Sequence, residues 1–232
     1  MKIKKILKIL ISPLFSLLFL ILTKIKFAPI LGTEMKFSLG VFFGPTLARI
    51  FGINYGTGII ILTHLFGFLL GIYKIKAIKD FFTFFPIIFA GFYFAKIFEG
   101  EKKLILLPSI CIFLFIFHPI GKEVWFYSLF WLIPILISLF KENLDKILKI
   151  QVFKIYSYSL GTALTDHAVG SVIYLYLLKI PANFWIQAVP HTILERLLIA
   201  GGISFFYLSE LVLIKLLEKI PFFLKLKSLI FE

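Results

Sequence analysis

The chain has 232 residues, of which 60% are hydrophobic and 16% are charged, and its mean hydropathy is +1.02. A soluble domain carries about 25% charged residues, so the composition excludes an ordinary soluble protein and predicts an integral membrane protein. The net charge of +13 does not indicate a nucleic-acid partner, because the lysines stand in short clusters between apolar runs and form no basic stripe.

Apolar segments separated by charges and prolines are candidate membrane helices. They cover residues 6–23, 37–53, 56–73, 81–98, 104–119, 124–140, 153–178 and 184–214. A helix needs roughly 20 residues to cross about 30 Å of hydrocarbon, and the second and fifth segments are short, so we expect six to eight spans. The chain is therefore predicted to be an all-α, polytopic transmembrane helix bundle that forms one integral membrane domain over residues 1–232.

The distribution of basic residues predicts the orientation. The first segment follows a basic head, as in a signal peptide, but it is as long as a span and no A-x-A-like cleavage site follows, so we expect a retained helix. With the N-terminus inside, the inner side receives sixteen Lys and Arg residues and the outer side eight. This bias predicts a multi-pass cell-membrane protein with both termini cytoplasmic. The amphipathic stretch KENLDKILKIQ, from Lys141, is expected to form a short interfacial helix.

The second segment carries a stripe of small residues. Gly40, Gly44, Ala48 and Gly52 recur every four residues and lie on one helix face, which lets another backbone approach closely. The stripe either packs within this chain or docks a separate membrane subunit. Pro45 lies inside the stripe and is expected to kink the helix.

The third segment carries His64 near its middle, with Gly67 and Gly71 on adjoining turns. A histidine in this position is either a hydrogen-bonded packing residue or a ligand-binding group. The glycines leave room beside it for a helix or for a small molecule.

The seventh segment places Asp166 and His167 side by side in an apolar chain. Asp166 is about 18 Å from the outer end of its segment at 1.5 Å per residue, hence near the bilayer centre. A carboxylate there costs about 2.5–3.5 kcal/mol and by default marks a site or a buried partner. Thr162 and Gly170 share its helix face, and Ser171 lies on the face of His167. These neighbours predict a helix face turned towards a protein interior or a cavity.

The eighth segment supplies partners in the stretch PHTILER. Pro190 is expected in the first turn of the helix, which sets His191 and Glu195 one turn apart on one face and Arg196 about 100° away. With the pair in the seventh segment they form a structural ion-pair network, a polar ligand-binding cluster, or a metal or catalytic site. Neither H-x-x-H, H-E-x-x-H nor G-x-S-x-G occurs, and we predict no metal and no cofactor.

The arrangement resembles the S components, the substrate-binding membrane subunits of energy-coupling factor transporters. The likeness covers about residues 30–100: a loop after a basic first helix, a short glycine-spaced helix ending in IFGINYG, and a glycine-rich helix closing with HLFGFLLG. The stretch IFGINYG loosely matches a turn of that family. Gly40, Gly44 and Ala48 match its docking stripe.

The resemblance implies capture of a vitamin-like nutrient near the outer face, followed by association with a transmembrane coupling subunit and two cytoplasmic ATPases. The chain has no G-x-x-x-x-G-K-[ST] phosphate loop of its own. Aromatic side chains, Tyr176 among them, are placed to stack on a planar ligand while Arg196 or Asp166 fixes its polar end. The residues expected to bind the ligand are Asp166, His167, Tyr174, Trp185, His191, Glu195, Arg196 and His64.

Three functions remain open. The leading hypothesis is a non-enzymatic membrane protein that binds a small solute for uptake, with lipid and a small molecule as partners and no nucleic acid. The second is a membrane enzyme that acts on a lipid or isoprenoid substrate through Asp166, His167, His191 and Glu195. The third is a non-catalytic membrane subunit that assembles through the glycine stripe.

Overall fold

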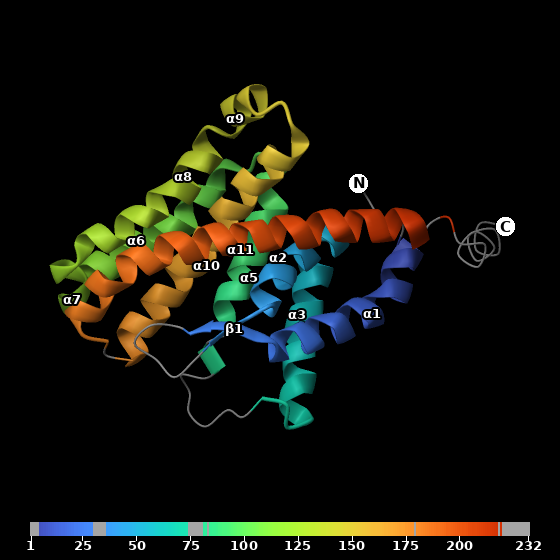
Figure 1. The fold of residues 1–232 in the computed structure, drawn as a ribbon, viewed down its shortest axis with the longest axis horizontal. Coiled ribbons are helices and arrows are strands. Elements are labelled where there is room, and N and C mark those ends of the chain that lie inside the picture. The colour runs from blue at the N-terminus through green and yellow to red at the C-terminus, as the bar shows by residue number, and fades with distance from the viewer. Residues whose placement is uncertain are drawn as a thin grey trace.

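The structure is a computed structural model that describes residues 5–29, 36–73, 81–82, 84–178, 180–217 and 219. These residues are mostly helical, as the sequence predicts, and a short antiparallel hairpin joins the first two helices (Figure 1). In chain order the elements are α1 (Lys5–Lys24), β1 (Lys26–Pro29), β2 (Lys36–Ser38), α2 (Gly40–Phe51), α3 (Ile53–Leu69), α5 (Phe85–Ile97), the 3-10 helix η1 (Lys102–Ile105), α6 (Leu106–Phe117), α7 (Pro119–Glu123), the 3-10 helix η2 (Trp125–Trp131), α8 (Leu132–Leu139), α9 (Lys141–Ile147), α10 (Gln151–Leu178) and α11 (Ala182–Leu217).

Each apolar segment of the sequence coincides with a helix or with a pair of consecutive helices. The sixth segment, residues 124–140, is divided between η2 and α8. The stretch that begins at Lys141 forms α9, so a short helix is present where one was predicted. The hairpin was not predicted, because its strands are only four and three residues long and their pattern gives no period-2 signal.

The expected position of Pro190 is wrong. The structure places it inside α11, which already begins at Ala182. The start is set instead by Pro181, whose carbonyl accepts a hydrogen bond from the Phe184 backbone N–H at 3.1 Å. A proline in a helix interior removes one backbone donor without ending the helix when packing holds the flanking turns.

The turn between α2 and α3 depends on two glycines of IFGINYG. Gly52 has a φ of +91°, a left-handed conformation that side chains disfavour. At Gly56, an added Cβ would lie 2.3 Å from the Leu47 carbonyl oxygen, so α3 can approach the α2 backbone only with glycine there. The Lys8 ammonium of α1 donates a 2.6 Å hydrogen bond to the Phe51 carbonyl at the end of α2.

The small-residue stripe is filled by the chain itself. A Cβ on Gly40 would lie 2.8 Å from Thr23 of α1, and one on Gly44 would lie 2.4 Å from Ile87 of α5. Ala48 is buried, and Gly91 of α5 packs against it. The stripe therefore packs α2 between α1 and α5, which corrects the docking interpretation: these residues leave no room for a second subunit.

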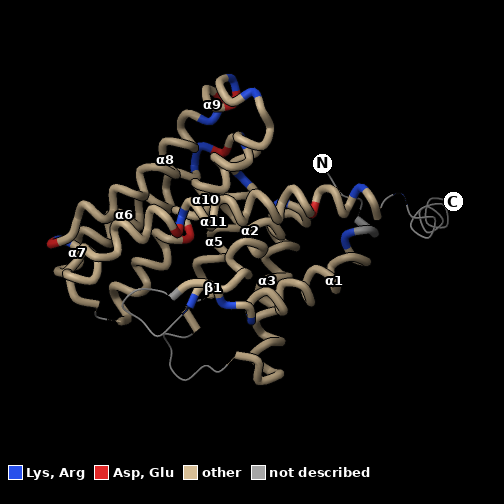
Figure 2. Tube along the Cα trace, in the orientation of Figure 1, with Lys and Arg blue, Asp and Glu red and all other residues tan. Residues whose placement is uncertain are grey.

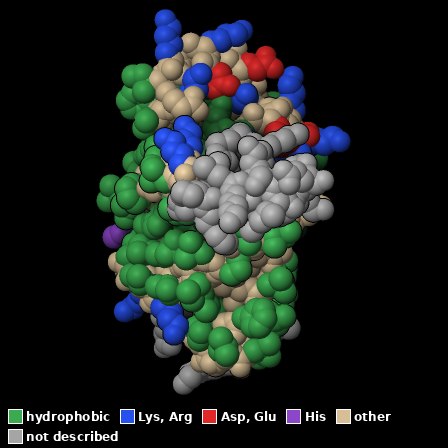
Figure 3. All heavy atoms as spheres, turned by 90° about the vertical axis from the view of Figure 1, so that its right-hand side faces the viewer, with side chains coloured by type: hydrophobic (Ala, Val, Ile, Leu, Met, Phe, Trp, Pro, Cys, Tyr) green, Lys and Arg blue, Asp and Glu red, His purple; other side chains and the backbone are tan. Residues whose placement is uncertain are grey.

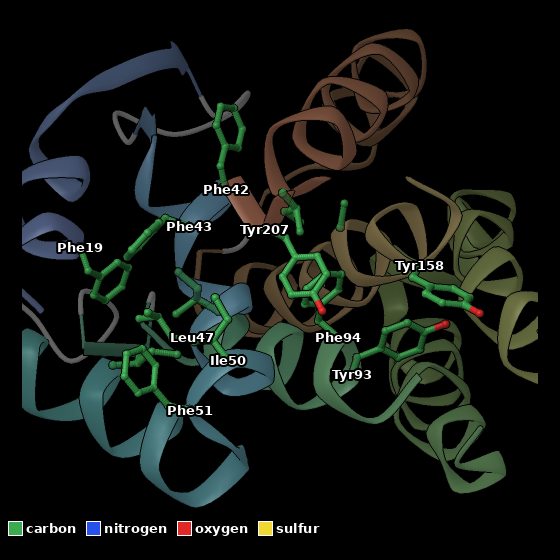
Figure 4. Close-up of a cluster of buried hydrophobic side chains, with 14 of the residues drawn as sticks. Phe19, Phe42, Phe43, Leu47, Ile50, Phe51, Tyr93, Phe94, Tyr158 and Tyr207 are labelled. Carbon is green, nitrogen blue, oxygen red and sulfur yellow. The ribbon is translucent and has the colours of Figure 1, made fainter. Parts of the chain in front are cut away.

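Aromatic and aliphatic side chains from distant parts of the sequence meet in one core (Figure 4). The helix α10 lies against α5 and α11, and α2 lies against α5 and α11. Phe43 of α2 contacts Phe19 of α1, and Phe94 of α5 contacts Tyr207 of α11. This core holds α10 and α11 at fixed positions along one wall of a cavity.

Apolar side chains also cover much of the exterior. Leu69, Leu194 and Phe205 are at least 65% exposed, and Figure 3 shows hydrophobic side chains over the middle of one face, with charged ones gathered above them. Charges concentrate at α9 and near β1 along the chain (Figure 2). Within the described ranges, α11 is long and apolar enough to cross a membrane, and the pair Trp125–Leu139 and Lys141–Ile147, bent by 75°, passes the same test as a broken helix.

Candidate ligand-binding cavity

A cavity of about 600 Å³ lies between the hairpin and the helices α3, α5, α10 and α11. Small-molecule sites usually enclose about 300–1,000 Å³, so the volume fits a small solute. Every side chain predicted to bind a ligand lines this one cavity: Asp166, His167, Tyr174, Trp185, His191, Glu195, Arg196 and His64. The structure thus brings together residues that lie more than a hundred positions apart in the sequence.

Arg196 is the centre of the charged end of the cavity. Its side chain is 3% exposed and its Nη1 lies 3.4 Å from Asp166 Oδ2. Its Nη2 lies 3.4 Å from Glu195 Oε2. The Arg196 Cζ lies over the ring of Phe37 from β2, 4.8 Å from the ring centroid, which is a cation–π contact. An ion pair therefore joins α10 to α11, as in the first of the three alternatives, and Phe37 of the hairpin adds a cation–π contact to it.

The two carboxylates offset the positive charge of the guanidinium, but they do not use all of its N–H donors. A guanidinium has five N–H donors, and charge-assisted N–H···O bonds are usually about 2.7–2.9 Å long, whereas both contacts here are 3.4 Å. The buried Nε has no hydrogen-bond partner in the described part of the chain. The long contacts therefore leave the terminal N–H donors of Arg196 able to bind an acceptor group in the cavity.

His167 belongs to a different kind of network. The Trp131 indole N–H donates to its Nδ1 at 3.1 Å, so in the neutral ring Nε2 carries the proton and donates to the Tyr127 hydroxyl at 2.9 Å. The Tyr127 hydroxyl is in turn hydrogen-bonded to Thr192 Oγ1 at 2.7 Å. Both ring nitrogens are occupied by protein groups, so His167 presents a ring edge to the cavity and no free lone pair.

Aromatic rings support this network from the side of α6 and α11. Trp185 is buried, and its ring centroid lies 5.1 Å from that of Tyr127. Its indole N–H donates to the Ile180 carbonyl at 3.3 Å. Phe115 of α6 packs edge-on to Trp131. Tyr174 also lines the cavity, whereas Tyr176 points away and donates to the Leu114 carbonyl at 2.9 Å. Stacking on a ligand is thus open to Tyr174 but not to Tyr176.

His64 lies at the end of the cavity nearest α3. Its Nδ1–H donates to the Ile60 carbonyl at 2.8 Å, which leaves Nε2 as an acceptor in the neutral ring. The room beside Gly67 is filled by the Tyr73 ring, which stacks on His64 with centroids 5.7 Å apart. The Tyr73 hydroxyl is hydrogen-bonded to Thr23 of α1 at 2.6 Å.

The hairpin contributes residues that the sequence analysis missed. Lys26, Lys36, Phe37 and Ser38 line the cavity, and the Lys26 ammonium donates to the Thr23 carbonyl at 2.9 Å. Partial desolvation lowers the pKa of Lys26. Lys26 and Lys36 are two of the eight basic residues that the charge distribution assigns to the outer side of the membrane. The signal that could have identified them as cavity residues is the clustering of polar residues between two apolar helices.

The geometry bears on the metal interpretation too. In the ranges that the structure describes, His, Cys, Asp and Glu residues form no group of three or more that could hold a metal ion. Comparison of the chain with protein-family models, with characterised proteins and with solved structures finds no match. The function is therefore inferred from the cavity itself.

Proposed function

We propose that the chain is a multi-pass protein of the cell membrane, with six to eight spans and both termini in the cytoplasm. The exposed leucine and phenylalanine side chains support this, because a soluble surface of this kind would aggregate. Figure 2 shows charges at α9 and at the hairpin, on opposite sides of the helices, besides others at α7 and at the start of α1; the proposal takes α9 and the hairpin as the parts that face water.

Cysteine labelling in intact cells tests this topology. Cysteine is introduced at Lys36 in the hairpin or at Glu142 in α9, both of which are exposed, while the natural Cys111 is buried. A membrane-impermeant maleimide should label the Lys36→Cys variant only. Labelling at both positions, or at Glu142 alone, contradicts the proposed orientation.

Within that membrane protein, we propose that the cavity binds a small solute for uptake. The observation that carries the proposal is Arg196 at the cavity wall, whose contacts to the two neighbouring carboxylates are both as long as 3.4 Å. Such a group suits a ligand that has an acceptor for the guanidinium and a donor for Asp166 or Glu195. The aromatic rings of Phe37 and Tyr174 suit a planar apolar part.

Retention of the solute tests this function. Protein purified from its own membranes is denatured, and the released small molecules are compared by mass spectrometry with those from the Asp166→Asn variant. The proposal predicts a molecule that is enriched with the wild type and lost from Asp166→Asn. The matched control Glu142→Gln, which alters an exposed carboxylate on α9, should retain it. Equal amounts in all three samples count against a site at Asp166.

The resemblance to S components extends the proposal to partners: a transmembrane coupling subunit and ATPases. The buried state of Gly40, Gly44 and Ala48 means that another surface would make this contact. Affinity purification of the tagged chain from its native membrane should recover these subunits. Recovery of the chain with its solute but with neither subunit would contradict the transporter while leaving solute binding intact.

The membrane-enzyme hypothesis receives less support. It relied on His167 as an acid or base, yet Trp131 and Tyr127 occupy both of its ring nitrogens. A residue in that role needs a ring nitrogen within reach of the substrate. His191 and Glu195 line the cavity, and turnover of a labelled isoprenoid lipid by the purified protein would revive this alternative.

A further inference from the structure

A buried carboxyl lies on α11, far from the charged end of the cavity. Glu210 is 3% exposed, and it is about 21 Å along α11 from Arg196 at 1.5 Å per residue. Here α11 crosses α2 (Figure 1), and Thr46 of α2 lies 2.7 Å from Glu210 Oε1. None of the interactions that build the cavity uses this group.

Counting protons at Thr46 shows which group donates. The Thr46 Oγ1 lies 2.6 Å from the Phe43 carbonyl oxygen as well as 2.7 Å from Glu210 Oε1. Both distances are those of ordinary O–H···O bonds, and two oxygens this close need a proton between them. A threonine hydroxyl has one proton, and a carbonyl oxygen can only accept. The Thr46 proton is therefore directed at Phe43, and the second proton must come from the Glu210 carboxyl.

The surroundings of Glu210 agree with a neutral acid. Glu210 Oε2 is buried and has no hydrogen-bond partner in the described part of the chain, and an unpaired ionised carboxylate at such a position is far costlier than an unpaired acid oxygen. No Lys, Arg or His nitrogen of the described residues lies within 4.0 Å of it.

The ionisable groups that the structure describes on the neighbouring elements form no ion pair with Glu210. Arg49 of α2 lies over the Phe98 ring, 4.3 Å from its centre. On α10, Tyr158 donates to Asp145, and Lys154 forms no ion pair within the described residues. On α11 itself, Lys215 is exposed. None of them supplies the positive charge that an ionised Glu210 would need.

We propose that Glu210 is a proton-binding site of the folded protein and that its bound proton joins α11 to α2. The interface between α2 and α11 continues towards the cavity. Phe206 packs edge-on against Phe43, and Phe42 fills the space beside Gly202. Loss of the proton would place an uncompensated charge between two helices that both contribute to the cavity wall. The proposal does not depend on the solute.

Infrared difference spectroscopy of the full chain in lipid at neutral pH tests it. The wild-type minus Glu210→Gln spectrum should contain the C=O stretch of a protonated carboxyl, whereas carboxylate stretches alone would overturn the proposal. Glu142→Gln is the matched control: its carboxylate is exposed, so its difference spectrum should contain carboxylate stretches only.

A second variant keeps the test decisive if Glu210→Gln fails to fold. Thr46→Val removes the hydroxyl that accepts from Glu210 while preserving the shape of the side chain. It should move the same C=O band to higher frequency, as expected for an acid that loses its hydrogen bond. A carboxyl region that is identical in the wild type and in Thr46→Val would contradict the proposal.

Discussion

Two polar groups on the same cavity wall are built in opposite ways. Around His167, donors and acceptors are matched one to one: Trp131 donates to the ring, the ring donates to Tyr127, and Tyr127 is hydrogen-bonded to Thr192. Around Arg196, two carboxylates stand 3.4 Å away and one buried N–H has no partner.

The difference separates stability from binding. A network whose hydrogen bonds are all made rigidifies the wall and offers a ligand nothing. A group held in place with unused donors is ready to bind, because its neighbours fix its position without saturating it. We therefore expect substitutions in the His167 network to affect folding and substitutions around Arg196 to affect the solute as well.

The largest expected effect is that of Arg196→Met. It leaves the half-buried Asp166 carboxylate without its counter-charge, and breaking a largely desolvated ion pair in this way costs up to about 3–5 kcal/mol. Adding Asp166→Asn removes the orphaned charge and should recover most of the stability while solute binding stays lost. Thermal unfolding of the two variants measures this; a double variant as unstable as the single one would show that packing rather than charge sets the cost.

A smaller loss is expected for Tyr127→Phe. The change leaves the His167 N–H and the Thr192 hydroxyl without their buried partner, which costs about 2–3 kcal/mol in total. Retained solute should be unchanged, because the Arg196 group is untouched. The control is Tyr174→Phe, since Tyr174 lines the same cavity and its hydroxyl has no protein partner in the described residues. Equal unfolding temperatures for the two variants would show that the His167 network stabilises the fold no more than the Tyr174 hydroxyl does.

The smallest effect is expected at the opposite end of α10, where Asp145 accepts hydrogen bonds from Lys141, at 2.9 Å, and from Tyr158. Burial alone would raise the pKa of Asp145, but these partners outweigh it and lower the pKa below the ordinary value of 3.8. The stabilisation is thus present above about pH 3.8 and is lost as the pH falls through the lower folded-state pKa.

Asp145→Asn should accordingly destabilise the protein by about 1 kcal/mol near neutral pH, and the gap to the wild type should close under acid. Unfolding temperatures measured across this pH range check the sign. Glu142→Gln, one turn away and exposed, should leave the profile unchanged. A gap that widens as the pH falls would mean that Asp145 is not held ionised by its partners.

Local patterns predicted the elements well and the contacts between them only in part. The helices could be read from apolar runs, and the inward face of Asp166 from its small polar neighbours. Pro190 misled because a proline marks a first turn on average, whereas here Pro181 had already started the helix.

The contribution of the hairpin to the cavity could not be predicted for a different reason. Phe37 and Lys36 reach Arg196 and the cavity through a hairpin of very short strands, and their position follows from tertiary packing rather than from sequence period. The saturated network escaped prediction likewise, since Tyr127, Trp131 and Thr192 come from segments with no motif in common. The small-residue stripe that begins at Gly40 fits either packing within the chain or docking of another subunit. Only the positions of α1 and α5 in the structure decide between the two.

A density map of the protein purified from its own membranes shows whether the Arg196 end of the cavity holds a solute. We predict a small molecule in the cavity with an acceptor atom within hydrogen-bond distance of the Arg196 guanidinium. A cavity without such a molecule, in which Arg196 closes onto Asp166 and Glu195 at about 2.7–2.9 Å, would contradict this.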